Sequence, residues 1–226
     1  LNVSHKQAYN DRGVTKFNLG QIKESLLDFN KAISIDPNFT KAYNNRALAF
    51  AKLKNQHKAI SDYDKFVGLL ISFDIELHFL PKDNSTSIDS IYTHDPCVVS
   101  NNGVILCNMG KKARLAEPNT MEDYFKSIQM PILGRIKAPG TLEGGDVVWI
   151  DEKTIAVGEG YRTNKEGIKQ LKHLLSDQVE NVISVPIPHW SGPEDCLHLM
   201  SNISPIDHNI FLVYSRLLPV PFRKYL

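Results

Sequence analysis

The hydrophobic and polar positions follow two different periods along the chain. Residues 8–66 carry apolar side chains at helical spacing, and this pattern repeats with a shift of 34 residues. The repeat is visible in four pairs of positions: Tyr9 and Tyr43, Asn10 and Asn44, Arg12 and Arg46, Phe29 and Tyr63. From about Ile71 onward the spacing changes to the alternation typical of β-strands. We therefore predict an α+β protein with an all-α segment at its N-terminal end.

Small residues in the first helical repeat indicate where two helices pack closely and then end. They are Gly13, Gly20, Ser25, Ala32 and Pro37. The proline disfavours helix in the residue before it, so the second helix should end near Asp36. This spacing resembles the tetratricopeptide repeat, a helix-turn-helix unit of 34 residues. The second copy is weaker, because Ile71 stands where the proline should recur.

The tetratricopeptide resemblance implies a peptide or protein partner. Four polar residues would lie on the inner helices, where members of this family often bind short peptides: Asn10, Asn44, Asn45 and Arg46. The segment "YNNRA" is similar to part of the clamp with which some members hold a C-terminal carboxylate. The alternative is that all four are solvated polar positions on a packing unit.

Three segments of the second region predict β-hairpins. They are "CVVSNNGVILC" with its turn at Asn102-Gly103, "DVVWIDEKTIAV" with its turn at Asp151 to Lys153, and "NISPIDHNIFLVY" with its turn near Asp207 to Asn209. We expect a helix over Met121 to Ile128 after the first hairpin, opened by Asn119 or Thr120. A second helix should span Lys165 to Leu175, with capping-box spacing from Thr163 to Glu166 and one apolar face made by Ile168, Leu171 and Leu175.

Hairpin, helix and further strand thus recur about every 50 residues, which we interpret as a second internal repeat present three times. Asp95, Glu143 and His198 stand at similar positions ahead of the three hairpin turns. If the units surround an axis, these side chains converge on one cavity. The bare backbone of Gly144 and Gly145 would let a ligand come close there.

Composition narrows the classes of function. Formal net charge is +1 and no block of Lys or Arg stands out among the 226 residues, so we predict no nucleic-acid partner. No apolar run reaches the roughly 20 residues of a membrane-spanning helix, and no membrane association is expected. The three cysteines, Cys97, Cys107 and Cys196, show no metal-like pairing or disulfide framework. We expect a reducing, cytoplasmic compartment, with no cofactor and no metal.

Five segments together resemble the guanidino-group-modifying enzymes, the dimethylargininase and arginine deiminase superfamily, and most of all its bacterial dimethylargininase-like members. In chain order they are "SIDSIYTHDP", "KKARLAEP", "GTLEGGDVVW", "GEGYRTNKEGI" and "DCLHLMSNISPID". The similarity runs from roughly Asp74 to Leu226. The resemblance implies the pentein fold, a five-bladed α/β-propeller of ββαβ units, of which about three are expected here.

The resemblance also implies roles for individual residues. Glu143 belongs to the catalytic set, and His198 is the general acid and base. Asp89 and Asp95 hold the substrate guanidinium. Arg162 and Arg114 bind the substrate carboxylate in relatives. "HLM" lacks the aspartate that arginine deiminases carry two residues after the histidine, which favours a dimethylargininase-like substrate.

Physical chemistry is consistent with these roles. A guanidinium is planar and strongly basic, so paired carboxylates can accept its N–H groups and fix its plane, and an arginine fork can recognise a carboxylate. Each residue also has a structural alternative: turn formation by Asp89 and Asp95, a core position for His198, a helix-surface pair of Arg162 with Glu166, and a solvated Arg114. Asp146 is interpreted as a cap for backbone N–H groups beside the glycines, outside the site.

The family nucleophile is a cysteine that lies beyond the segment matching Leu217 to Phe222. None of the three cysteines matches it. Cys196 is close to His198 but is expected to be a buried thiol or supporting residue, and Cys97 and Cys107 are expected in the core. We therefore expect a fragment that lacks the nucleophile and is inactive by itself.

Two hypotheses of different classes follow, with domains at 1–68 and 72–226. The first is a hydrolase, or part of one, that cleaves a C–N bond of dimethylarginine or a related guanidino compound by covalent thiol chemistry. The second is a tetratricopeptide interaction protein fused to a catalytically inactive pentein fragment.

Overall fold

The structure, a computed structural model, describes residues 3–189, 192–193 and 197–226. The chain folds into two compact units, Leu1–Phe79 and Leu80–Leu226, here called the helical unit and the mixed unit. Among the described residues, no helix is both long and apolar enough to cross a lipid bilayer.

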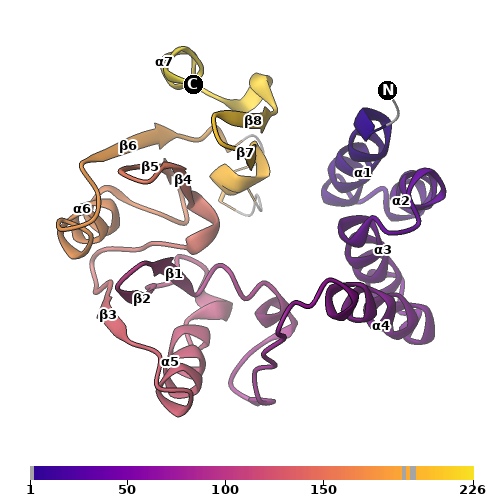
Figure 1. Ribbon diagram of the computed structural model, residues 1–226, viewed down its shortest axis with the longest axis horizontal. Coiled ribbons are helices and arrows are strands. Elements are labelled where there is room, and N and C mark those ends of the chain that lie inside the picture. Colours follow the sequence, from indigo (N-terminus) through magenta and orange to yellow (C-terminus); the bar gives the residue numbers. More distant parts are fainter. Residues whose placement is uncertain (1–2, 190–191, 194–196) are drawn as a thin grey trace. The chain divides into compact units, whose positions relative to one another are not determined.

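The helical unit consists of two helical hairpins (Figure 1). Helices α1 (Val3–Asn18) and α2 (Ile22–Ile35) form the first, and α3 (Thr40–Lys52) and α4 (Gln56–Ser72) form the second. The predicted end of α2 before Pro37 is confirmed, with Asp36 as its cap. Gly13 is small because a Cβ there would lie 2.5 Å from the Phe29 ring, so the glycine allows α1 and α2 to approach.

The 34-residue repeat extends to an ion pair between an arginine and a buried aspartate that joins the two helices of each hairpin. Arg12 donates two hydrogen bonds to the carboxylate of Asp28, and Arg46 donates two to Asp62. Both aspartates are buried. Arg12 and Arg46 are 34 residues apart, as are Asp28 and Asp62, so the same contact occurs once in each repeat. A charged, bidentate hydrogen bond of this kind restricts how the helices can slide past one another.

The mixed unit is built from three consecutive strand hairpins, as expected. They are β1 (Cys97–Ser100) with β2 (Gly103–Leu106), β4 (Val147–Asp151) with β5 (Thr154–Glu159), and β7 (Ile203–Asp207) with β8 (Ile210–Val213). The first turn has Gly103 at φ 137° and the third has Asn209 at φ 59°. These left-handed conformations are favoured by glycine and tolerated by asparagine.

A helix and a further strand complete the first two repeats. Helix α5 (Glu117–Ser127) leads to β3 (Ile132–Arg135), which pairs parallel to β2, and α6 (Lys165–Leu174) leads to β6 (Asn181–Pro186), which pairs parallel to β5. The third hairpin is followed by α7 (Val220–Tyr225). In the described part of the chain it forms a sheet of two strands, so the third repeat has no parallel outer strand there.

Two details of the predicted helices are wrong. Helix α5 begins at Glu117 rather than at Met121, because Pro118 fits the first turn of a helix, where its missing N–H is not needed. Helix α6 is capped by Asn164, whose side chain accepts from the Gly167 N–H, so the cap is not Thr163. The Thr163 hydroxyl makes other contacts.

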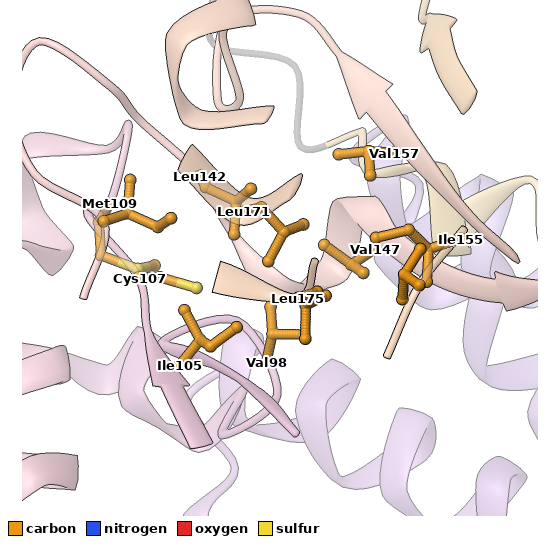
Figure 2. Close-up of a cluster of buried hydrophobic side chains, with 12 residues drawn as sticks. Val98, Ile105, Cys107, Met109, Leu142, Val147, Ile155, Val157, Leu171 and Leu175 are labelled. Atoms are coloured by element: carbon orange, nitrogen blue, oxygen red, sulfur yellow. The ribbon is translucent and has the colours of Figure 1, made fainter. Parts of the chain in front are cut away.

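The central hairpin β4-β5 packs on both faces, and this arrangement joins the three repeats. Alternate residues Val147, Ile155 and Val157 face a core shared with the first repeat, where Figure 2 shows them pointing toward Leu171 and Leu175 from α6 and its end. The residues between them, Val148 and Ala156, face a second core shared with η4 (Leu199–Ser201), β7 and α7. Since successive strand residues point to opposite faces, a strand buried on both sides is apolar throughout.

Candidate active site

Glu143 occupies the centre of the site. It is fully buried just before the short turn η3 (Gly144–Asp146) that leads into β4. One carboxylate oxygen, Oε1, accepts the backbone N–H groups of Gly110 and Lys111, both at 3.0 Å. The other, Oε2, lies 2.8 Å from Nε2 of His198. A buried carboxylate with this many donors can stay charged in the absence of water.

His198 comes from the third repeat and reaches both acids. Its Nε2 contacts Glu143, and its Nδ1 lies 3.9 Å from Oδ1 of Asp95. The three side chains come from the three consecutive repeats, and their potential donor atoms lie within 4.8 Å of one another. The structure therefore brings together Asp95, Glu143 and His198, as the alignment of the repeats predicts.

Gly144 and Gly145, which lie between Glu143 and Asp146 in the sequence, must be glycines because other groups of the site come very close to their backbone. A Cβ on Gly145 would lie 2.6 Å from Oδ1 of Asp95 and 2.8 Å from the His198 ring. A Cβ on Gly144 would lie 2.1 Å from the backbone oxygen of His94. These distances are too short for a side chain, so the bare backbone leaves room for protein groups of the site as well as for any ligand.

Arg114 is buried rather than solvated. Its guanidinium contacts Oδ2 of Asp95 at 2.5 Å and makes three hydrogen bonds to the buried carboxylate of Glu117. Burial alone would lower the pKa of Arg114, but the hydrogen bonds and charges of Glu117 and Asp95 outweigh it and raise the pKa. Arg114 thus holds one oxygen of Asp95 in place and remains charged.

Arg162 is also buried, and its Nη1 lies 3.5 Å from Oε1 of Glu143. The predicted alternative, a surface pair with Glu166, is therefore not its environment. Asp89 lies apart from the cluster in η1 (Ile88–Ile91), where it accepts a hydrogen bond from Nζ of Lys111 at 2.6 Å. Lys111 links Asp89 to the cluster, because its side chain binds Asp89 and its backbone N–H donates to Glu143.

Asp146 has a different role from the predicted cap beside the glycines. Its Oδ1 accepts the backbone N–H of Leu199, the residue after His198, at 3.0 Å, and its Oδ2 accepts the hydroxyl of Thr163 at 2.7 Å. The interpretation as a local cap was wrong, because the partners come from segments 17 and 53 residues away. No local pattern could have shown them, although the motif "EGGD" contains the residue.

The site is electrostatically coupled. Burial would raise the pKa of Glu143, but the hydrogen bond from His198, the charges of His198 and Arg162, and the Lys111 N–H together lower it. Burial would lower the pKa of His198, and the hydrogen bond to Glu143 with the charges of Asp146, Asp95 and Glu143 raises it. The geometry therefore favours an imidazolium next to a carboxylate, a pair that can donate and take back a proton.

The described cysteines are unsuitable nucleophiles. Cys97 and Cys107 are buried, as expected, and free. Burial and the charge of Asp95 raise the pKa of Cys97 to about 11, and burial raises the pKa of Cys107 well above its usual value. Thiols in such surroundings stay protonated and unreactive. Cys196 lies outside the described residues.

The spacing of Asp95, Glu143 and His198 would also admit a metal ion. An ion bound by all three would have to replace the bond between His198 and Glu143, and it would lie beside the guanidinium groups of Arg114 and Arg162. Fixed positive charges next to a site oppose a divalent cation. We assign no metal to this cluster.

Comparisons with known proteins agree with the geometry. The family model described as arginine deiminase matches residues 87–222, more than half of the chain. Two models of tetratricopeptide repeats match residues 8–54 and 40–69.

Curated relatives include two N(G),N(G)-dimethylarginine dimethylaminohydrolases. The protein from Pseudomonas aeruginosa is 27% identical over 169 residues, covering 73% of this chain and 61% of the relative. The protein from Streptomyces coelicolor is 29% identical over 174 residues, covering 72% of this chain and 64% of the relative. The chain thus spans about three fifths of the length of these relatives.

Solved structures show the same similarity. The Pseudomonas aeruginosa dimethylarginine dimethylaminohydrolase, as a cysteine-to-serine mutant complexed with citrulline, superposes with a TM-score of 0.59 at 26% identity, covering 70% of this chain and 59% of that one. The N-terminal domain of ArgZ, a cyanobacterial arginine dihydrolase, has a TM-score of 0.64 at 18% identity, covering 75% and 59%, and shows the fold alone. With a matching family model over residues 87–222 and these pentein neighbours, the chain belongs to the arginine deiminase family of guanidino-group hydrolases, preceded by tetratricopeptide repeats.

Proposed function

We propose that the mixed unit carries the guanidinium-binding and acid-base part of a guanidino hydrolase site. The observation that carries this proposal is the meeting of Asp95, Glu143 and His198, one from each repeat, around a single point. A guanidinium offers flat N–H donors, and two carboxylates near an imidazole suit it in both charge and geometry. Family membership supports the same chemistry.

Within this proposal each residue has a defined task. The carboxylates of Asp95 and Glu143 accept N–H groups of the substrate guanidinium. His198 protonates the departing amine and later activates water. Arg162, buried beside Glu143, is the candidate for the carboxylate at the other end of the substrate. Arg114, predicted for the same task, is already bonded to Glu117 and Asp95, and its task in this proposal is to hold Asp95 in place. Asp89 is linked to Glu143 through Lys111, whose side chain donates to Asp89 and whose backbone N–H donates to Glu143.

The proposed reaction is hydrolysis of a C–N bond in dimethylarginine or a similar compound. A thiolate attacks the central guanidino carbon, the C–N bond to the amine breaks, and the amine leaves with a proton from His198. Water then displaces the thiol from the thiouronium adduct and gives citrulline. Neither Cys97 nor Cys107 can supply the thiolate. We therefore propose that this chain binds guanidino compounds without turning them over by itself.

The substrate class favoured is dimethylarginine rather than arginine. Met200 stands two residues after His198, where arginine deiminases carry an aspartate. Its side chain is partly exposed and uncharged. An apolar residue there fits a methylated guanidinium better than an unmodified one, since methyl groups cannot donate hydrogen bonds.

We further propose that the three repeats are blades of an α/β-propeller. Support comes from their equivalent hairpins, from the parallel outer strands β3 and β6, and from the shared packing on both faces of β4-β5. Corresponding residues of successive blades face a common axis, which explains why the site draws on all three.

For the helical unit we propose protein interaction. Its contacts modify the predicted peptide clamp. Arg46 is already held by Asp62 and Asn30, and Asn10 is buried and accepts the side-chain N–H of Asn45. A peptide carboxylate would have to compete for these groups. Asn44 is the remaining residue of the predicted set, so a partner should be sensitive to Asn44→Ala.

Isothermal titration calorimetry with dimethyl-L-arginine, L-arginine and L-citrulline tests the binding proposal. We expect dimethylarginine to bind, and Asp95→Asn and Glu143→Gln to weaken binding about tenfold or more, because a hydrogen bond to a charged group is worth about 1.5–3 kcal/mol. Asp123→Asn and Glu152→Gln remove the same charges from exposed positions and serve as matched controls.

Two outcomes would contradict the proposal: no binding by the unaltered chain, or equal affinities for site and control variants. A colorimetric citrulline assay accompanies the titration. Turnover that is lost in Cys196→Ser would show that Cys196 is the nucleophile and would overturn the proposal of an inactive chain.

A further inference from the structure

A buried network of hydrogen bonds connects three residues of the candidate site through Asp146. The carboxylate of Asp146 is 2% exposed, so water cannot replace its partners. Its Oδ2 accepts the hydroxyl of Thr163 at 2.7 Å, and the same hydroxyl oxygen accepts the backbone N–H of Glu143 at 3.1 Å. Its Oδ1 accepts the backbone N–H of Leu199 at 3.0 Å. None of these bonds is within a helix or a sheet.

Each end of the network is a site residue or its direct neighbour in the chain. Thr163 follows Arg162, Leu199 follows His198, and the Glu143 N–H belongs to the central acid itself. One carboxylate therefore fixes the backbone beside all three groups. Thr163 and Leu199 lie 17 and 53 residues away from Asp146 in the sequence, whereas Glu143 is a near neighbour. Tight packing around it supports this role, since a Cβ on Gly158 would lie 2.7 Å from Oδ1 of Asp146.

The cost of burying this carboxylate indicates a function beyond stability. A buried charge without an opposite charge in direct contact destabilises a fold unless its hydrogen bonds compensate. Asp146 makes hydrogen bonds to an N–H and a hydroxyl, and no salt bridge to a cation is found for it among the described residues. An asparagine could accept the same N–H without the charge.

Resting on the proposed guanidino site, we propose that Asp146 is a positioning residue that holds His198, Glu143 and Arg162 in register through Leu199 and Thr163. The negative charge of Asp146 also raises the pKa of His198, together with the charges of Asp95 and Glu143. Arg162 supplies a positive charge beside Glu143. Burial raises the pKa of Asp146 to about 6, against the charge of His198 and the bonds from Thr163 and Leu199, which lower it. Ionised Asp146 and protonated His198 therefore stabilise each other.

The test is the pKa of the His198 imidazole, measured by nuclear magnetic resonance on the full chain with labelled histidine. His198→Ala assigns the signal among the eight histidines. Asp146→Asn should lower the His198 pKa by about 1, because the charge of Asp146 helps to raise that pKa. Thr163→Val should lower it less, because it removes the hydroxyl that favours the ionised carboxylate. Thr163→Ser should restore the original value.

Asp151→Asn, at the exposed end of the same strand β4, is the control and should leave the His198 pKa unchanged. The proposal is overturned if Asp146→Asn and Thr163→Val lower only the melting temperature and leave the His198 pKa where it was. If Asp146→Asn fails to fold, Thr163→Val and Thr163→Ser still decide the question.

Titration with dimethyl-L-arginine separates this proposal from the one on which it rests. We expect Asp146→Asn to weaken binding about tenfold, and Thr163→Ser to bind like the unaltered chain. Absence of binding by the unaltered chain would contradict the guanidino site. The imidazole pKa would still report whether Asp146 acts on His198, since that measurement needs no ligand.

Discussion

At the scale of single residues, the site depends on the absence of a side chain at Gly145. Asp95 and His198 occupy the space where a side chain at that position would start. Any other residue must push one of them away. The glycine thus allows Asp95 and His198 to lie close to each other.

We predict that Gly145→Ala abolishes measurable binding of dimethyl-L-arginine while the mixed unit stays folded. The added methyl group would lie 2.6 Å from the Asp95 carboxylate, so the acid must turn away. Calorimetry gives the affinity, and circular dichroism checks the fold. Gly68→Ala is the control: nothing lies within 4 Å of its Cβ position in α4, so it should stabilise the helix by up to about 1 kcal/mol. Unchanged binding by Gly145→Ala would contradict the assignment of the site.

The raised pKa of His198 predicts how stability changes with pH. Its folded pKa lies above the ordinary histidine value of 6.5, so its contribution to stability is complete below pH 6.5 and is lost as the pH rises through the folded pKa. Glu143 has a lowered pKa, so its contribution to stability changes with pH only below its ordinary pKa of 4.5. Asp146 has a pKa raised to about 6, so its ionisation in the folded state costs stability, and this cost is almost fully present by pH 6.5.

Between pH 6.5 and 8, His198 should therefore contribute more than Glu143 or Asp146 to the change of the unfolding free energy with pH. We predict that the free energy of unfolding of the mixed unit falls over this range and that His198→Ala flattens the curve. Urea unfolding followed by tryptophan fluorescence measures it, because Trp149 lies in β4 of this unit and the chain's other tryptophan, Trp190, falls within residues 80–226 of the sequence. A curve that rises with pH would contradict the assigned protonation state.

At the scale of elements, the third hairpin differs from the other two in its outer edge. Strand β2 is covered by β3 and strand β5 by β6, whereas β8 pairs with β7 and with no further strand among the described residues. Ile210, Leu212 and Val213 on β8 are exposed. An uncovered apolar edge strand leaves its backbone groups open and promotes association.

We predict that backbone amides of β8 exchange with deuterium much faster than those of the central strand β5, measured by hydrogen exchange with mass spectrometry. Leu212→Lys should reduce self-association in light scattering without lowering the melting temperature, because a lysine on an edge opposes pairing. Protection of β8 equal to that of β5 would show that its edge is covered in solution.

At the scale of the whole molecule, the two units have separate cores and separate proposed tasks. The helical unit has its own buried apolar residues, including Phe29 and Ala32, and its repeated arginine–aspartate pairs. The mixed unit has the two cores on either side of β4-β5 and a third cluster between the first hairpin and α5. A ligand of one unit stabilises that unit by mass action, whatever the other does.

We predict that dimethyl-L-arginine at about 100 times its dissociation constant stabilises the mixed unit by about 2.7 kcal/mol and leaves the helical unit unaffected. Tryptophan fluorescence reports the mixed unit alone, and far-ultraviolet circular dichroism reports mainly the helices. At the same ligand concentration, a tenfold loss of affinity in Glu143→Gln should reduce this stabilisation to about 1.4 kcal/mol. Equal shifts by both probes would indicate that the units unfold as one.

Much of this protein could be predicted from local patterns. The 34-residue period, the turn residues at Asn102-Gly103 and Asn209, and the apolar runs of β4 and β5 each depend on neighbours within a few positions. Such patterns determine which helices and hairpins form, because backbone torsions and face periodicity are local properties. The alignment of repeats even predicted that Asp95, Glu143 and His198 correspond.

Tertiary structure alone decided which polar groups meet. Asp89 is bonded to Lys111, Arg114 is held by Glu117, and Asp146 binds Leu199 and Thr163 instead of capping its neighbours. These partners are fixed by how the two faces of β4-β5 pack against the repeats before and after it. A carboxylate in a turn has the same local sequence signature wherever it points, so only the packing of distant segments selects its partner.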